Sequence, residues 1–208
     1  MNYSIVKRLI DITVSFIALL FLVPFFIIIA IIIPLTSKGP SFYFQERLGL
    51  KGRIYKMFKF RSMYLNAADI RNDDGTTYNG KDDPRVTKVG KFLRETSINE
   101  LPQLLNILLG DMSLVGPRPE LPESLAFLSN NYPDKLKVLP GLTGWAVVNG
   151  RNNVPLEKRR ELDVWYAQHI SLLLDVKIII KTVQLVISSK DVYNEYSKKL
   201  KPIEDAKD

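Results

Sequence analysis

The stretch Ile12–Leu35, ITVSFIALLFLVPFFIIIAIIIPL, contains no charged side chain. At a rise of ~1.5 Å per residue, a straight helix of this length crosses the ~30 Å hydrocarbon core of a bilayer. The run is longer than the apolar region of a signal peptide, and no small-residue cleavage site follows it. A single membrane-spanning helix is the simplest interpretation of this stretch.

Two features favour instead a helix that enters and leaves the membrane by the same face. Pro24, near the middle of the stretch, removes a backbone donor and clashes with the preceding turn, so a kink is expected there. Lys7 and Arg8 precede the stretch, and many basic residues follow it over 38–61. Because basic residues favour the cytoplasmic side, we predict a re-entrant membrane helix over 1–36. A single-span anchor with an external basic domain is the alternative.

Composition limits the class of partner. The 208 residues suit one domain plus an appendage, and a formal net charge of +7 favours an anionic partner. Nucleic acid, anionic lipid and phosphorylated small molecules all meet that description. We expect no nucleic-acid partner, because no helix-turn-helix, zinc or RNA-binding signature is present. The sequence has no cysteine, which excludes disulfides and thiolate metal sites.

Residues 37–190 predict a small mixed α/β domain, so the fold class is α+β. The stretch 41–63 alternates aromatic and polar residues around Gly49 and Gly52, which predicts two short strands and a turn. Residues 66–85 are rich in Asn, Asp and Gly and predict a surface loop. The polar segment 191–208 reads as a C-terminal tail.

A helix is predicted within 89–110, where leucines recur at three- and four-residue spacing. Thr96 or Ser97 can cap its start, with Glu100 as the second member of a capping box. Gly110 is expected to end the helix.

A second apolar helix is predicted over 171–190. Its polar residues form one stripe: Lys177, Lys181, Gln184 and Ser188. Such a helix can lie in the membrane interface with its lysines toward the headgroups. A core helix with a solvated stripe fits the same periodicity.

Candidate phosphate-binding residues lie around the predicted helix start. Unpaired N–H groups at a helix N-terminus favour anions, and Asn99 and Glu100 lie there. Arg94, Arg118 and Arg151 occur in nearby segments that could converge on that end. Arg118, between two prolines, is a low-entropy donor for a bidentate phosphate contact. Taken singly, each of these arginines is equally explained as a solvated surface charge.

Several motifs in order resemble the bacterial sugar transferases, and more narrowly the small monotopic phosphoglycosyl transferases. The resemblance extends from Lys7 to about Lys190. The motifs are KRLIDI, FYFQERLGLKGRIYKMFKFRSM, DDPRVTKVGKFLRETS, ELPQLLNILLGDMSLVGPRPE, LPGLTGW, VNGRN and ELDVWYAQHISLLLDVKI.

This resemblance implies an Mg²⁺-dependent reaction at the cytoplasmic face of the bacterial inner membrane. A UDP-sugar gives its phosphosugar to polyprenol phosphate and releases UMP, as a first membrane step of glycan assembly. An aspartate attacks the sugar-linked phosphate, and the lipid phosphate then attacks the covalent intermediate. Inner-membrane lipids are the implied surroundings, and homo-oligomer formation is left open.

Residue by residue, the Asp-Glu pair of the family falls on Asn99 and Glu100. The resemblance gives Glu100 a role in metal binding or proton transfer. It further implies phosphate or substrate binding by a basic set: Lys59, Arg61, Arg94, Arg118 and, in VNGRN, Arg151. Pro24 matches the proline that breaks the family's membrane helix.

Two positions depart from the family pattern. Asn99 stands at the nucleophile position, and Val147 stands where glutamine is usual. Because an amide is a poor nucleophile, this chain is expected to bind the substrates and to fail to turn them over. An engineered replacement, a degenerate paralogue and a repurposed protein are all open. The alternative function is a catalytically silent membrane-associated binding or scaffold protein.

Overall fold

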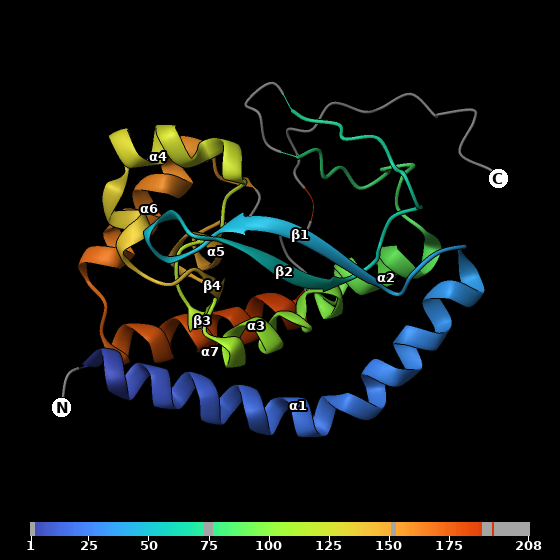
Figure 1. Ribbon diagram of the computed structural model, residues 1–208, viewed down its shortest axis with the longest axis horizontal. Coiled ribbons are helices and arrows are strands. Elements are labelled where there is room, and N and C mark those ends of the chain that lie inside the picture. The colour runs from blue at the N-terminus through green and yellow to red at the C-terminus, as the bar shows by residue number, and fades with distance from the viewer. Residues whose placement is uncertain (1–2, 73–76, 151–152, 189–192, 194–208) are drawn as a thin grey trace.

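A computed structural model of the chain describes residues 3–72, 77–150, 153–188 and 193 (Figure 1). Helices and strands are mixed, and the strands form two separate two-stranded sheets. The principal elements are α1 (Tyr3–Thr36), β1 (Phe42–Leu48), β2 (Ile54–Phe60), α2 (Lys88–Glu95), α3 (Gln103–Leu109), β3 (Ser113–Val115), α4 (Leu125–Asn131), β4 (Gly141–Thr143), α5 (Trp145–Val148), α6 (Leu156–Gln168) and α7 (Leu172–Ser188). Short 3₁₀ helices are η1 (Leu50–Gly52), η2 (Ile98–Glu100), η3 (Pro122–Ser124) and η4 (Pro133–Lys137).

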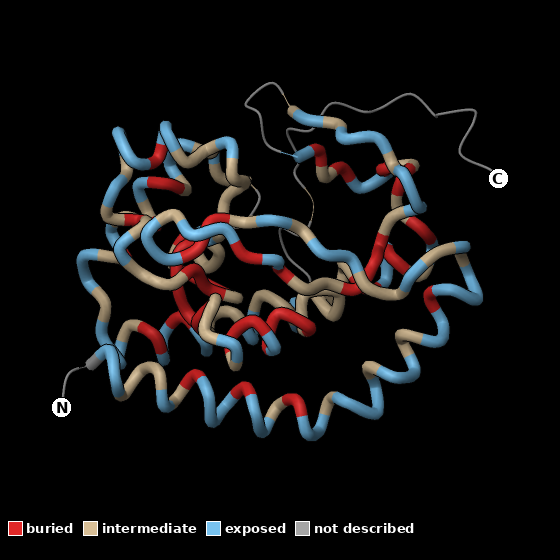
Figure 2. The backbone as a smooth tube through the Cα atoms, in the orientation of Figure 1, coloured by how far each residue is buried: buried red, intermediate tan, exposed pale blue. Residues whose placement is uncertain are grey.

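Helix α1 runs without interruption through Pro24 and Pro34. Figure 1 shows it along one edge of the molecule, bent part-way along its length. By length and composition α1 could cross a membrane, and most of its outward side is exposed (Figure 2). Entry and exit by one membrane face, with the kink at Pro24, stay predictions, as does the division of the chain at 36 and 190.

The first turns of α1 are held to α3 by Arg8. Its guanidinium donates to the carbonyl oxygens of Ile107 and Leu108, at 2.6 and 3.0 Å. These carbonyls belong to the last turn of α3, where helical N–H donors run out, and the Ile107 carbonyl also accepts from Gly110 N–H at 3.1 Å. Gly110 ends α3 in the left-handed conformation, φ 94°, which confirms the prediction made from the sequence.

Two carboxylates complete the attachment of α1. Asp11, almost fully buried, accepts a hydrogen bond at 3.0 Å from the backbone N–H of Leu114 in β3. Lys7 forms an ion pair with Asp175 of α7, and Asp175 also accepts from the Tyr166 hydroxyl at 2.6 Å. Lys7 and Arg8, which the sequence offered as a topology signal, are therefore engaged inside the protein.

Strands β1 and β2 form the predicted hairpin. They pair antiparallel, with Tyr43 opposite Lys59, and the turn lies between Leu48 and Ile54. Asn106 of α3 covers the outer edge of β2: its side chain accepts from Phe58 N–H at 2.9 Å and donates to Lys56 C=O at 2.8 Å. A buried amide thus replaces a third strand at an edge that would otherwise have unpaired backbone groups.

The segment predicted as one capped helix is divided in two. Helix α2 is capped by Thr87, whose hydroxyl accepts from Gly90 N–H at 2.8 Å. Ser97 then adopts φ 59° without a side-chain cap bond, η2 follows, and α3 starts only after Pro102. The capping-box prediction was wrong, because Ser97 makes no side-chain cap bond; Glu100 Oε1 pairs with Lys59.

Two apolar clusters join α1 to the rest of the protein. In one, Leu19 packs with Tyr55, Met57, Leu104 and Ile107. The other contains Ile33, Phe60 and Leu93, and it includes an edge-to-face contact between Phe26 and Phe60. Figure 2 shows that buried residues gather between α1 and the hairpin.

Helix α7 is confirmed as a single helix with two different sides. Ile178 is fully buried, whereas Leu173 and Ile187 are about four-fifths exposed, at 81% and 79%. Lys177 and Lys181 lie over the Trp145 ring, 5.9 and 5.6 Å from its centroid. The helix is therefore partly core and partly an apolar surface with cations beside it.

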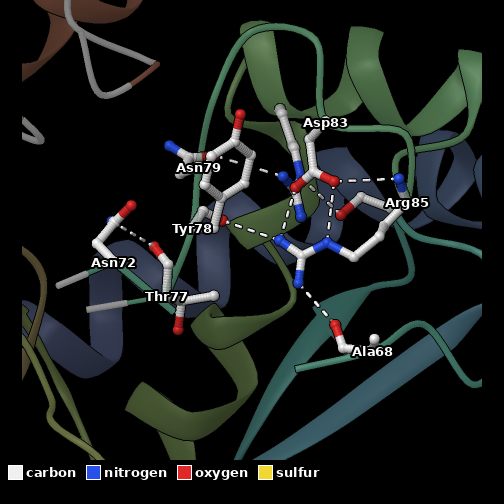
Figure 3. A network of polar contacts seen from close by, with 9 residues as sticks. Ala68, Asn72, Thr77, Tyr78, Asn79, Asp83 and Arg85 are labelled. Carbon is white, nitrogen blue, oxygen red and sulfur yellow. Dashed lines mark hydrogen bonds and ion pairs between the residues drawn. The ribbon is translucent and has the colours of Figure 1, made fainter. Parts of the chain in front are cut away.

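A buried ion pair organises the loop between β2 and α2 (Figure 3). Arg85 contacts both carboxylate oxygens of Asp83, at 2.9 and 2.7 Å. The same guanidinium donates to the carbonyls of Ala68 and Tyr78. Asp83 and Arg85 are 6% and 4% exposed, so this loop has a fixed core of its own.

Replacing Arg85 with Leu should destabilise the protein by about 3–5 kcal/mol, because it leaves the Asp83 carboxylate buried and unpaired. Arg71→Leu is the matched control, since the Arg71–Asp69 pair is exposed and should contribute less than about 1 kcal/mol. Urea unfolding of the detergent-solubilised protein measures both changes. Equal losses of unfolding free energy in the Arg85→Leu and Arg71→Leu variants would contradict a structural role for the buried pair.

Candidate active site

The site is built around an ion pair between β2 and η2. The Lys59 ammonium lies 3.0 Å from Glu100 Oε1, and Asn99 precedes Glu100 in the same turn. Burial lowers the pKa of Lys59, and Glu100 opposes that shift. The ion pair therefore fixes the turn that carries both residues of the predicted catalytic pair.

Two arginines add positive charge beside this ion pair. Arg118 and Arg47 both lower the pKa of Lys59, and Arg118 also lowers that of Arg47. The acidic side chain acting on both Lys59 and Arg47 is Glu100. Among the described residues, Lys59, Arg47 and Arg118 thus gather beside the Glu100 carboxylate, an arrangement that favours a polyanionic ligand.

Close backbone contacts fix the loop that carries Arg118. Gly116 N–H donates to Thr143 C=O, and Gly141 N–H donates to Pro117 C=O, both at 2.9 Å. A Cβ added to Gly141 would lie 2.1 Å from Gly116 N, and one added to Gly144 would lie 2.1 Å from Gly116 O. Only glycine permits this approach of the LVGPRP and LPGLTG segments.

A buried charge cluster fixes the same loop from its other end. Glu120 accepts from Arg160 Nη2 at 2.6 Å and from Lys135 Nζ at 2.7 Å. Lys135 also pairs with Asp163 at 2.9 Å. Burial alone would raise the pKa of Glu120, but the Arg160 and Lys135 contacts outweigh it and lower that pKa to about 2. Glu120 is therefore ionised throughout the physiological range.

Arg94 approaches the site from the end of α2. Its guanidinium donates to Ser62 Oγ at 2.9 Å and to Asn79 Oδ1 at 3.4 Å. Burial lowers its pKa, while Asp83 and, more weakly, Glu100 raise it. The structure thus brings Arg94 into the electrostatic range of Glu100 and ties it to the loop organised by Asp83.

Arg61, a predicted substrate-binding residue, has a different place in the structure. Arg61 is buried, and its guanidinium donates to four backbone carbonyls: those of Ser37, Gly39, Pro40 and Met63. It fixes the connection between α1 and β1, and four of its five N–H donors are used in these contacts. Arg151 lies outside the described residues. Val147 is half-buried in α5.

Arg47 is the site residue that sequence reasoning missed as a ligand-binding candidate. It was one of many basic residues after the apolar stretch, and only the hairpin register places it on the face that carries Lys59. The alternation of Tyr43, Gln45 and Arg47 along β1 was the available signal.

Metal ligands are few in this site. Among the described residues, no group of three or more His, Asp or Glu side chains could hold a metal ion. Glu100 is one carboxylate, and Mg²⁺ is commonly bound by one or two carboxylates together with substrate phosphates. The residues therefore fit an Mg²⁺ that binds with a phosphate ligand, and they do not form a cage of protein ligands alone.

The family model described as bacterial sugar transferase matches residues 2–189. The chain belongs to the bacterial sugar transferase family. It is 41% identical over 188 residues to the "Uncharacterized sugar transferase EpsL" of Bacillus subtilis, with 90% of each chain covered. It is 44% identical over 195 residues to the Klebsiella pneumoniae "UDP-glucose:undecaprenyl-phosphate glucose-1-phosphate transferase", and 40% identical over 198 residues to the Komagataeibacter xylinus "Undecaprenyl-phosphate glucose phosphotransferase".

The relatives of this sugar transferase differ in length. The chain spans 41% of the Klebsiella protein and 37% of the Komagataeibacter protein, while 90% of the chain is matched in each case. The part of this chain that matches the family model, residues 2–189, includes positions 59, 100 and 118. The resemblance inferred from the motifs is confirmed at the level of the family.

Glu120→Gln should flatten the dependence of stability on pH. A carboxylate whose pKa falls on folding stabilises the protein above its unfolded pKa of about 4.3, and that contribution is lost as pH falls toward 2. The variant should be less stable than the wild type at pH 7, and the difference should shrink between about pH 5 and pH 2. Unfolding free energies measured across this range provide the test.

Glu161→Gln is the control, because the Glu161–Lys158 pair on α6 is exposed and should contribute under about 1 kcal/mol. A wild-type profile that matches the Glu120→Gln profile at low and neutral pH would contradict a structural role for the cluster.

Proposed function

We propose that this sugar transferase moves a phosphosugar from a UDP-sugar to polyprenol (undecaprenyl) phosphate and releases UMP. The observation that carries the proposal is the excess of positive charge around Glu100, beside the position of the family's nucleophile. Such a site suits a diphosphate donor. Two relatives are named as a glucose-1-phosphate transferase and a glucose phosphotransferase of undecaprenyl phosphate, which supports the same reaction class.

The charged residues divide into binding and positioning roles. Arg118 and Lys59 contact the donor phosphates and stabilise the charge that develops during transfer. Glu120, Arg160 and Lys135 hold the Arg118 loop in place. Glu100 would hold Mg²⁺ when the donor binds, and the metal would then neutralise diphosphate charge.

Residue 99 decides whether the transfer occurs. With an aspartate there, the carboxylate attacks the sugar-linked phosphorus, the bond to UMP breaks, and a phosphosugar-enzyme forms. An oxygen of polyprenol phosphate then attacks that phosphorus and frees the carboxylate. Asn99 offers no negative charge for the first step, so the chain as written binds its donor without comparable turnover.

A silent binding protein is the second candidate, and Asn99 is the observation that favours it. Both candidates predict donor binding. They differ in whether restoring a carboxylate at position 99 restores the reaction.

Asn99→Asp should raise UMP release from a UDP-sugar by several orders of magnitude, because loss of a catalytic nucleophile costs on the order of 10⁶-fold elsewhere. The variant should also form a phosphosugar adduct, seen by intact-protein mass spectrometry, that polyprenol phosphate discharges. Asn130→Asp, an exposed change on α4, is the control and should leave UMP release unchanged. No adduct and no UMP from a panel of UDP-sugars would reject the assignment of the nucleophile.

The membrane placement that we propose is monotopic, at the cytoplasmic face of the inner membrane. Helix α1 and the outer side of α7 offer the exposed apolar surface, and the donor binds on the aqueous side. Lipid and nucleotide substrates can meet only where the site borders both phases.

Single cysteines can test this placement, since the natural chain has none. Ser4→Cys and Lys38→Cys, at the two ends of α1, should react with an impermeant maleimide from the same, cytoplasmic side. Pro24→Leu should straighten the helix and increase the fraction that spans. Labelling of the two cysteines from opposite sides in the parent chain would establish a spanning helix instead.

A further inference from the structure

Arg47 shares a face of the β1–β2 hairpin with Lys59. Tyr43 is opposite Lys59 in the register, and Arg47 is opposite Tyr55. Because side chains alternate along a strand, residues 43, 45 and 47 lie on the same side as residues 55, 57 and 59. Arg47 therefore belongs to the side of the hairpin from which Lys59 reaches Glu100.

The Arg47 guanidinium is oriented but incompletely used. Nη2 donates to Gln45 Oε1 at 2.7 Å, and Nη1 has a long contact of 3.4 Å with Pro119 C=O. Nε is buried and has no acceptor among the described residues. An arginine has five N–H donors, so donors are left over on a group that lies against the Arg118 loop.

The charge of Arg47 is only partly compensated by the described residues. Burial, together with the neighbouring Arg118, lowers its pKa to about 10, so it stays protonated at neutral pH. Glu100 acts on it only at a distance and is already paired with Lys59. Burial raises the pKa of Tyr55, so this phenol stays neutral and supplies no counter-charge. Among the described residues, the half-buried Arg47 guanidinium has no carboxylate in an ion pair with it, and a bound anion would supply the missing counter-charge.

We infer that Arg47 is a further phosphate-binding cation of this site and contacts the diphosphate of the nucleotide-sugar together with Arg118. The inference rests on the proposed function. A planar guanidinium suits two phosphate oxygens, and the two arginines lie on different elements, so they can hold a diphosphate from two directions. Gln45 is a positioning residue, because it orients the guanidinium without reaching the ligand itself.

The inference can be tested by isothermal titration calorimetry, with UDP titrated into the full chain in detergent. EDTA is included so that affinity reflects the protein's own cations. Arg47→Met should weaken UDP binding roughly ten- to a hundredfold, as should Arg118→Ala, the range for a hydrogen bond to a charged group. Lys56→Met is the matched control: Lys56 is exposed on the opposite face of β2, and its loss should leave the dissociation constant unchanged.

A purely structural role for Arg47 makes a different prediction. If Arg47 only supports Pro119, Arg47→Met lowers the unfolding temperature while UDP binds with wild-type affinity, and that result overturns the inference. Should Arg47→Met fail to fold, Arg47→Lys and Gln45→Ala replace it. Both keep a cation and should bind UDP more weakly than the wild type, whereas unchanged affinity in both would overturn the inference.

Failure of the proposed function gives a separate result. If the wild-type chain binds neither UDP nor UDP-glucose, with or without Mg²⁺, the nucleotide-sugar proposal falls, and the Arg47 inference falls with it. If the wild type binds UDP and only Arg118→Ala weakens binding, the proposed function stands and Arg47 is excluded.

Discussion

The attachment of α1 by its own polar side chains is the constraint on which the other elements depend. The apolar side chains of so long a helix form no hydrogen bonds that would fix its position. Specific polar contacts are needed to hold it in one place on the rest of the protein. Arg8 supplies them by donating to the last carbonyls of α3, and Asp11 by accepting from β3. The helix that carries most of the lipid-compatible surface is thereby connected to the two elements that flank the site. Asn99 and Glu100 precede α3, and Arg118 follows β3.

The site itself shows how a small protein keeps several cations together. Lys59, Arg47 and Arg118 repel one another, and Glu100 compensates only part of that charge. Their positions are imposed by backbone structure: the hairpin register for Lys59 and Arg47, and glycine-to-glycine contacts for the Arg118 loop. Glu120, held by Arg160 and Lys135, fixes the other end of the Arg118 loop. The fold itself therefore holds these cations together, which is what the proposed anionic donor requires.

Neighbouring residues of one motif serve different purposes here. In KFRSM, Lys59 pairs with Glu100 in the site. Arg61 instead donates to backbone carbonyls near the end of α1, and the Ser62 hydroxyl accepts from Arg94. In DDPR, Arg85 and Asp83 form a buried pair that organises a long loop rather than a ligand site. A basic residue within a family motif is therefore not by itself evidence of phosphate contact. Its donors must be accounted for first.

The sequence by itself determined the apolar helix, the hairpin around Gly49 and Gly52, the end of α3 at Gly110, and the family, because each depends on local composition or ordered motifs. It also indicated the Asn99–Glu100 position and the Arg118 turn. Tertiary structure decided the long-range partners of the charged residues, such as Lys59 with Glu100 and Arg160 with Glu120. Glu100 could satisfy a local capping box or a distant lysine, and local spacing cannot weigh one against the other. Arg47 and Arg61 look alike in sequence, but strand register gives one a place beside Lys59 and buries the other among carbonyls. Those choices depend on which groups folding brings within a few ångströms of each other, and that is a property of the packed chain rather than of any segment.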